Sequence, residues 1–256
     1  MNSWALVTGA TSGIGESFTR LLASKKYNVV LVARDLPRLQ ERAQALEAKY
    51  GIKTHVIQAD LATDEGCLKI EKYILENQVD VLINNAGFGT SKAFTMSTLE
   101  IEQQLLDVLV RTPMRLMHVA LPLMKQRNQG IIINVSSVAG YIAGGSYSAS
   151  KSYLTVLTES LHTELAATNV TVSALCPGFT RTEFHQRGKM SMKGLPNFLW
   201  LNSDRLVEQS WKDAMKGKPV SVPGWQYKLL VFVVQTLVPR SIVRKVGMNL
   251  RNKQRK

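Results

Sequence analysis

The sequence predicts a doubly wound α/β domain, and two features of the chain support this prediction. Six short runs rich in β-branched and apolar residues are separated by helix-length amphipathic stretches. Most of the runs are continuously apolar, which is typical of parallel strands covered on both faces. Because parallel strands need right-handed crossovers, the helices must lie on both sides of one sheet. The predicted strands cover residues 5–8, 29–33, 53–59, 79–84, 131–136 and 170–176.

Length and composition fit one domain with a C-terminal extension. The chain has 256 residues, of which 45% are hydrophobic, and this is enough for one large core. We expect the α/β domain to span 1–223 and a basic, apolar extension to span 224–256. The chain starts in a strand pattern without a secretory signal, and Cys67 and Cys176 lie far apart without metal-ligand spacing. A reduced, cytoplasmic protein without a metal site is expected.

Most of the formal net charge of +13 lies near the C-terminus. Residues 216–256 contain ten Lys or Arg and no Asp or Glu, so the rest of the chain is only mildly basic. No nucleic-acid-binding module accompanies this charge, and we expect no nucleic-acid partner. The apolar run at 229–238 is about half as long as a membrane span. Two alternatives stay open: the extension lies on an anionic membrane surface, or it packs on the domain or on a second copy.

A glycine-rich turn lies between the first predicted strand and the first predicted helix. It reads Thr8-Gly9-Ala10-Thr11-Ser12-Gly13-Ile14-Gly15. Glycines at this place let a pyrophosphate approach the backbone, and the helix N-terminus favours its negative charge. The residues expected to bind a dinucleotide here are Gly9, Thr11, Ser12, Gly13, Ile14 and Gly15.

The end of the second predicted strand indicates which dinucleotide would bind. Arg34 lies where an acidic residue would accept the ribose hydroxyls of NAD, and a guanidinium suits the 2′-phosphate of NADP. Asp35 follows directly and could contact the ribose instead. After the third strand, Asp60 and Leu61 are expected at the adenine, with helix capping as the alternative for Asp60. NADP(H) is the predicted cofactor.

A tyrosine and a lysine lie four residues apart in a predicted helix over 147–165. Tyr147 and Lys151 therefore share one helical face. A lysine beside a tyrosine favours the phenolate, so we expect the pKa of Tyr147 to fall toward neutrality. Such a phenol can exchange a proton with a hydroxyl or a carbonyl, as the reduction of a carbonyl requires.

Two further motifs follow predicted strands. They are Asn84-Asn85-Ala86-Gly87 after the fourth strand and Pro177-Gly178-Phe179-Thr180-Arg181-Thr182 after the sixth. With the glycine turn and the Tyr-x-x-x-Lys pair, they make the chain from residue 3 to about 185 resemble the classical short-chain dehydrogenase/reductase family. The motif details are most similar to ketoacyl-reductase-like and ketone-reducing members. The resemblance implies a Rossmann-type sheet of strand order 3-2-1-4-5-6-7 and a nicotinamide cofactor.

The same resemblance assigns roles to individual residues. Tyr147 would protonate the carbonyl oxygen, Lys151 would lower the pKa of that tyrosine and hold the nicotinamide ribose, and Ser137 would hydrogen-bond the substrate oxygen. Ser136 is the less favoured serine, and Asn84 would tie neighbouring strands together. The remaining cofactor contacts implied are Asn85, Ala86, Gly87, Pro177, Gly178, Thr180 and Thr182.

Two features depart from the family pattern. Ser137 precedes Tyr147 by ten positions instead of about thirteen, and Gly144-Gly145 would let this short loop close tightly. Leu109 replaces an asparagine that in the family helps to hold a water near the lysine. A leucine side chain cannot hydrogen-bond, but its carbonyl could hold the water if the helix predicted over 99–126 is distorted. Pro113 would leave that carbonyl free, because proline has no amide hydrogen.

The segment after the sixth strand would shape the substrate site, with a lid over about 183–202. Its large apolar residues favour a hydrophobic substrate. They are Phe184, Met190, Met192, Leu195, Phe198, Leu199 and Trp200. His185 is expected to be a loop residue without a catalytic role, and 188–196 has the composition of a mobile loop.

Taken together, these features predict an NADPH-dependent oxidoreductase that reduces a hydrophobic ketone or a 3-oxoacyl-type substrate to an alcohol. The resemblance also implies a homo-oligomer, a dimer or a tetramer, formed through the apolar helices around 105–125 and 147–165. The alternative function is an NADP(H)-binding regulatory or membrane-surface protein with weak or no catalysis.

Overall fold

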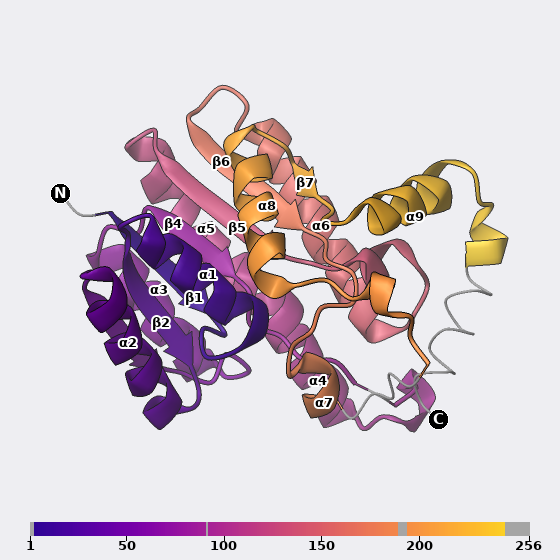
Figure 1. Ribbon diagram of the computed structural model, residues 1–256, viewed down its shortest axis with the longest axis horizontal. Coiled ribbons are helices and arrows are strands. Elements are labelled where there is room, and N and C mark those ends of the chain that lie inside the picture. The colour runs from indigo at the N-terminus through magenta and orange to yellow at the C-terminus, as the bar shows by residue number, and fades with distance from the viewer. Residues whose placement is uncertain (1–2, 91, 189–193, 244–256) are drawn as a thin grey trace.

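Seven parallel strands form one sheet in the computed structural model, which describes residues 3–90, 92–188 and 194–243 (Figure 1). The strands are β1 (Trp4–Thr8), β2 (Asn28–Ala33), β3 (Thr54–Gln58), β4 (Val81–Asn84), β5 (Gly130–Val135), β6 (Val170–Leu175) and β7 (Val220–Ser221). Their order is β3-β2-β1-β4-β5-β6-β7, and every neighbouring pair is parallel. The predicted fold class and strand order are therefore confirmed.

Strand ends differ from the sequence predictions by at most two residues. The largest difference is in β4, which begins at Val81. Just before it, Asp80 joins this strand to the start of β1, because its carboxylate accepts a hydrogen bond from the Trp4 amide (2.8 Å). β7 has only two residues and extends the edge of the sheet beside β6. So short a strand has no periodicity by which a sequence could reveal it.

Helices cover both faces of the sheet. They are α1 (Gly13–Ser24), α2 (Leu36–Tyr50), α3 (Asp64–Glu76), α4 (Leu99–Leu106), α5 (Thr112–Gln126), α6 (Ser146–Glu164), α7 (Phe184–Arg187), α8 (Ser203–Met215) and α9 (Trp225–Thr236). On one face, α1, α2 and α8 bury Phe18, Leu39 and Trp211 in one hydrophobic cluster. On the other, α3, α5 and α6 contribute to a second cluster that includes Ile70 and Leu116. This double covering explains the continuously apolar strands.

The helix predicted over 99–126 is interrupted. A π-helical turn, Asp107–Arg111, separates α4 from α5. Pro113 lies just after it and has no amide hydrogen to donate to the carbonyl of Leu109. The helix is therefore distorted at the leucine that replaces the family asparagine, which is the condition under which its carbonyl could hold a water.

The C-terminal extension packs on the domain through α9. Tyr227 and Val231 are buried, and the Tyr227 hydroxyl donates to the Leu199 carbonyl (2.6 Å) and accepts from the Phe179 amide (3.0 Å). Figure 1 shows α9 at the edge of the molecule, far from α1, α2 and α3. No helix in the described part of the chain is long and apolar enough to cross a membrane.

Candidate active site

The loop between β5 and α6 brings Ser137 to Tyr147. It forms a 3-10 turn over Val138–Tyr141 and enters α6 through Gly145, whose φ of +89° suits glycine. The Ser137 hydroxyl lies close enough to Tyr147 to lower the pKa of its phenol. The shortened loop thus still joins the two predicted residues.

The two adjacent serines at the end of β5 have different surroundings. The Ser136 hydroxyl is buried and donates to the Lys151 carbonyl (2.7 Å) within α6. The Ser137 hydroxyl accepts from the Ala139 amide (3.1 Å) and faces Tyr147. Ser136 therefore holds α6 against β5, and Ser137 is the serine that faces the phenol.

Lys151 is a buried cation one helical turn from Tyr147. Its ammonium nitrogen Nζ donates to the Val135 carbonyl (2.6 Å) and lies 5.8 Å from the centroid of the Tyr147 ring. Burial lowers the pKa of Lys151 to about 8, because the charged form loses its hydration. The carbonyl of Val135 is a partner that the sequence does not reveal, since any residue at that position would supply it.

The expected fall in the pKa of Tyr147 is wrong for this geometry. Burial raises the pKa to about 12, and the hydrogen bond with Ser137 lowers it by less. The Lys151 ammonium is directed at the Val135 carbonyl, so its charge does not offset the desolvation of the phenolate. Tyr147 is therefore protonated at neutral pH and is able to act as a proton donor.

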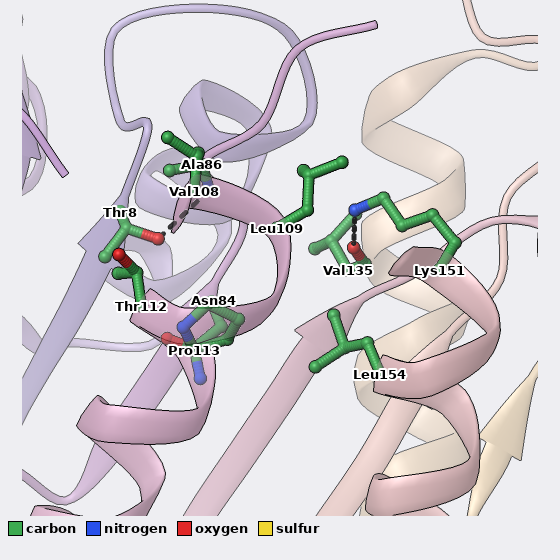
Figure 2. A pocket seen from close by; sticks show the side chains of 10 residues that line it. All are labelled: Thr8, Asn84, Ala86, Val108, Leu109, Thr112, Pro113, Val135, Lys151 and Leu154. Atoms are coloured by element: carbon green, nitrogen blue, oxygen red, sulfur yellow. Dashed lines mark hydrogen bonds between the residues drawn. The ribbon is translucent and has the colours of Figure 1, made fainter. Parts of the chain in front are cut away.

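A small cavity adjoins Lys151 (Figure 2). It has a volume of about 10 Å³, roughly the space that one water needs. Leu109 and Pro113 of the distorted helix line it together with Asn84 and Lys151. The Asn84 Oδ1 atom is buried and finds no hydrogen-bond partner among the described residues. One of the residues that line the cavity thus has an unused acceptor.

The glycine turn fits a pyrophosphate. Gly13 begins α1 with a φ of +58°, and a Cβ there would lie 2.9 Å from a methyl carbon of Thr182. Ser12 precedes the helix in an extended conformation, and its side chain makes no capping hydrogen bond. The first amides of α1 therefore have no side-chain cap and are available to an anion. Of the other turn residues, Gly15 packs against the Gly9 carbonyl, Thr11 is buried and Ile14 is partly exposed.

Asn85 fastens the end of β4 to the glycine turn. Its side-chain amide donates to the carbonyls of Thr8 (2.9 Å) and Gly9 (3.1 Å). The Thr8 hydroxyl in turn accepts from the amides of Asn85 and Ala86. Gly87 follows and is exposed. The two motifs, separated by about seventy residues in sequence, form one rigid rim.

The asparagine before them links strands, as expected. The side-chain amide of Asn84 on β4 donates to the side-chain oxygen of Asn134 on β5 (2.8 Å). Asn134 continues the chain of hydrogen bonds to Thr158 of α6 (2.8 Å). These buried amides fix α6, and with it Tyr147 and Lys151, relative to the sheet.

The residues predicted near the adenosine lie at the ends of β2 and β3. Arg34 and Asp60 are both exposed there. Asp35 caps α2, because its carboxylate accepts from the Arg38 amide (3.1 Å), and the Asp60 carboxylate accepts from the Ala62 amide (3.1 Å). Leu61 is buried in the core, and its carbonyl accepts from the Thr112 hydroxyl (2.7 Å).

The Pro-Gly motif after β6 has two functions in the structure. Gly178, which follows Pro177, makes room for the Tyr227 ring of α9, since a Cβ there would lie 2.0 Å from the ring. Thr180 is buried and its hydroxyl donates to the Gly178 carbonyl (3.0 Å). Thr182 is the threonine that lies against Gly13 of the glycine turn. The motif thus reaches both α9 and the pyrophosphate site.

Aromatic rings continue from Tyr147 into the lid. Phe184 lies 5.9 Å from Tyr147, centroid to centroid, and His185 of α7 lies 5.5 Å from both Phe184 and Trp200. Phe179 contacts His185 and Trp200 and was missed by the sequence interpretation. His185 is helical, not a loop residue, and burial lowers the pKa of its imidazole. Phe198 is exposed, and Met190 and Met192 lie outside the described residues.

Comparison with known proteins agrees with this geometry. A description of one family, short chain dehydrogenase, matches residues 3–192. The chain belongs to the short-chain dehydrogenase family. Members of this family are oxidoreductases that bind a nicotinamide cofactor.

Two named relatives of this short-chain dehydrogenase act on oxoacyl substrates. The chain is 37% identical over 185 residues to the 3-oxoacyl-(acyl-carrier-protein) reductase FabG of Aquifex aeolicus, covering 70% of this chain and 74% of the relative. It is 26% identical over 263 residues to the very-long-chain 3-oxoacyl-CoA reductase-A of Danio rerio, covering 100% of this chain and 80% of the relative.

A solved structure is also similar. The short-chain dehydrogenase from Sphingobium yanoikuyae in complex with NADPH has a TM-score of 0.84 and 30% identity. The match covers 92% of this chain and 94% of that chain. The single Rossmann-type domain is thus shared almost over its whole length.

Proposed function

We propose that this short-chain dehydrogenase is an NADPH-dependent reductase that converts a hydrophobic ketone or a 3-oxoacyl thioester to an alcohol. The observation that carries the proposal is the placement of the Ser137 hydroxyl and the Lys151 ammonium beside the protonated Tyr147, with the ammonium 5.8 Å from the centroid of the tyrosine ring. A bound NADPH supplies the hydride. Tyr147 donates the proton to the carbonyl oxygen, and Ser137 orients that oxygen.

Reprotonation of Tyr147 is proposed to pass through Lys151 and the adjoining cavity. The cavity of about 10 Å³ has room for one water beside Lys151. The unpaired Asn84 Oδ1 and the Leu109 carbonyl, which receives no hydrogen bond from Pro113, are acceptors for that water. The leucine at this position is therefore compatible with a relay.

The preference for NADPH rests on the end of β2. Asp35, the residue that could bind the NAD ribose, is engaged as the cap of α2, whereas the Arg34 guanidinium is exposed there. An arginine at this place offers a bidentate partner to a 2′-phosphate. The similar Sphingobium yanoikuyae enzyme is described in complex with NADPH, which supports the same choice.

The proposed hydrophobic substrate rests on the aromatic lid and on the named relatives. Phe184 contacts Tyr147, so an apolar substrate would meet a ring next to the proton donor. Both named relatives are 3-oxoacyl reductases. A 3-oxoacyl thioester combines a reducible ketone with an apolar chain and fits these surroundings.

We test the reaction by following NADPH and NADH consumption with long-chain ketones and 3-oxoacyl thioesters. Wild-type protein should consume NADPH faster than NADH, and Tyr147→Phe should lower kcat by about 100- to 10,000-fold, because general acid catalysis contributes about this much. NADPH binding by the variant, read by fluorescence, is the control for folding. Tight NADPH binding without turnover in the wild type would instead favour a regulatory binding protein.

We also propose that the protein forms a homo-oligomer through α4, α5 and α6. These helices expose large apolar side chains that a solvated monomer would leave in water. They are Leu99, Leu106, Met114, Tyr153 and Val156.

We further propose peripheral contact with a membrane through α9. Trp225, Leu229 and Phe232 lie on one face of α9 and are 73%, 55% and 56% exposed. We call these three side chains the outer stripe. Opposite them, Tyr227 and Val231 anchor the helix to the domain. The sequence of 216–256 contains ten basic residues and no acidic one, a composition that favours contact with anionic lipid.

A further inference from the structure

We propose that Arg38 and Glu183 form a strap across the cofactor cleft, and that opening this ion pair controls how fast the dinucleotide enters and leaves. The inference rests on the proposed function, because it needs a dinucleotide to lie between the glycine turn and the lid. It concerns two residues outside the predicted site.

The pair has the geometry of a strong ion pair. The Arg38 nitrogens Nη1 and Nη2 donate to Glu183 Oε2 (3.1 Å) and Oε1 (2.5 Å), so that both carboxylate oxygens are engaged. Arg187 also donates to Glu183 Oε2 (2.6 Å). Hydrogen bonding from Arg38 is the largest cause that holds the pKa of Glu183 below its ordinary value. Most surface ion pairs contribute little to stability, but a bidentate pair between arginine and a carboxylate is an exception.

The two residues belong to opposite sides of the cleft. Arg38 lies in the first turn of α2, four residues after Arg34, and is held there by its amide hydrogen bond to Asp35. Glu183 directly follows Thr182, which contacts Gly13 at the start of α1. The pair therefore links α2 to the segment that directly follows the contact of Thr182 with the glycine turn.

A dinucleotide on the glycine turn would extend from the end of β2 toward Tyr147 and Lys151. In this proposal it passes beneath the connection between Arg38 and Glu183, and α7, which begins at the next residue, cannot move away while that pair is closed. Both pyrophosphate and ribose are common to NADPH and NADH. A strap therefore predicts a change in exchange rates for both dinucleotides, with a smaller change in affinity.

A different function of Arg38 makes the opposite prediction. If Arg38 left Glu183 to bind the 2′-phosphate, Glu183 would compete with NADPH and not with NADH. Removing the charge of Glu183 would then tighten the binding of NADPH and leave the binding of NADH unchanged. Measuring the binding of both NADPH and NADH therefore distinguishes the strap from a 2′-phosphate contact.

The test is stopped-flow fluorescence of NADPH and NADH with full-length wild type, Glu183→Gln, Arg38→Gln and the double variant. The strap predicts dissociation about threefold to tenfold faster in each single variant, for both dinucleotides, because one bidentate pair is lost. The double variant should resemble the single ones, since the two residues act as one unit. High salt should reduce the difference in dissociation rate between each variant and the wild type, because salt screens the ion pair.

Glu208→Gln is the matched control, because Glu208 forms an exposed ion pair with Lys212 on α8 (2.8 Å), and it should leave the rates unchanged. Unaltered dissociation in Glu183→Gln would overturn the strap, as would a gain in affinity confined to NADPH. Absence of dinucleotide binding in the wild type would instead overturn the proposed function itself.

Discussion

Lys151 combines a catalytic assignment with an unfavourable environment. It is 4% exposed, and its ammonium is matched by one carbonyl, that of Val135, and by no carboxylate among the described residues. Transfer of a cation from water into such a site disfavours the charged form. A residue that the proposed reaction requires is therefore expected to destabilise the fold.

Replacing this lysine should give a pH-dependent gain in stability. The pKa of Lys151 is about 8 in the folded chain and 10.5 as the ordinary value. Between these two pH values the unfolded chain binds more protons than the folded chain, so the wild type gains stability as pH rises. Below pH 8 the lysine is charged in both states, and the folded chain bears the full free-energy penalty of burying that charge. At about 1.4 kcal/mol per pKa unit the penalty is roughly 3 kcal/mol. The gain in stability of Lys151→Met over the wild type should thus be largest near neutral pH.

The measurement is thermal unfolding of wild type and Lys151→Met at neutral pH and near pH 10. The Tm of the variant minus that of the wild type should be more positive at neutral pH. Lys212→Met, at an exposed position of α8, should show no comparable trend. A difference in Tm that does not change with pH would contradict the argument. Reductase activity of Lys151→Met should be lost at either pH.

At the scale of elements, α9 and the Pro-Gly motif hold each other in place. Tyr227 is 3% exposed, and its hydroxyl binds the backbone on both sides of the site, at Leu199 and at Phe179. Its ring occupies the space that a side chain at position 178 would need. The helix that exposes the outer stripe is consequently fastened to the wall of the substrate site.

Gly178→Ala should destabilise the protein by about 1–3 kcal/mol, the usual range for overpacking. The new Cβ would lie 2.0 Å from the Tyr227 ring, which its two hydrogen bonds keep from moving away. Thermal unfolding of Gly178→Ala, Tyr227→Ala and the double variant measures the coupling. In the Tyr227→Ala background, Gly178→Ala should have little further effect. Equal losses in both backgrounds would show that the ring is not the cause.

At the scale of the whole molecule, α9 lies at an edge away from the helices α1, α2 and α3 (Figure 1). The glycine turn and the Ser137-Tyr147-Lys151 cluster lie at the carboxyl ends of the strands, whereas the outer stripe lies on α9, which follows the last strand. α9 projects at one edge of the molecule in Figure 1. A membrane could therefore receive this edge without covering the sheet or the cofactor cleft.

Sedimentation with liposomes tests this arrangement. Wild type should sediment with vesicles of phosphatidylcholine and phosphatidylserine and less with phosphatidylcholine alone, and high salt should weaken binding. Replacing Trp225, Leu229 and Phe232 by Ser should reduce binding by at least about tenfold, because three large apolar side chains are lost. Serine at Leu68 and Leu75, which are exposed on α3, is the matched control. Unchanged sedimentation, or loss of self-association without loss of lipid binding, would contradict the membrane contact.

The sequence by itself determined the elements and the motifs of this protein. Apolar runs and glycine spacing depend on neighbours along the chain, so the strands, the strand order implied by the family and the Tyr147/Lys151 pair could be predicted. Pro113 also showed that the Leu109 carbonyl receives no hydrogen bond from the residue four positions on, whereas the π-helical turn there was established only by the structure.

Only the tertiary structure decided how distant groups affect one another. The pKa of Tyr147 depends on burial and on where the Lys151 ammonium points, and the capping of α2 by Asp35 competes with any ribose contact. Gly178 makes room for Tyr227, 49 positions away, and Arg38 meets Glu183 across 145 positions. Such contacts have no local signal, since desolvation and long-range pairing arise only when the folded chain brings separate segments together.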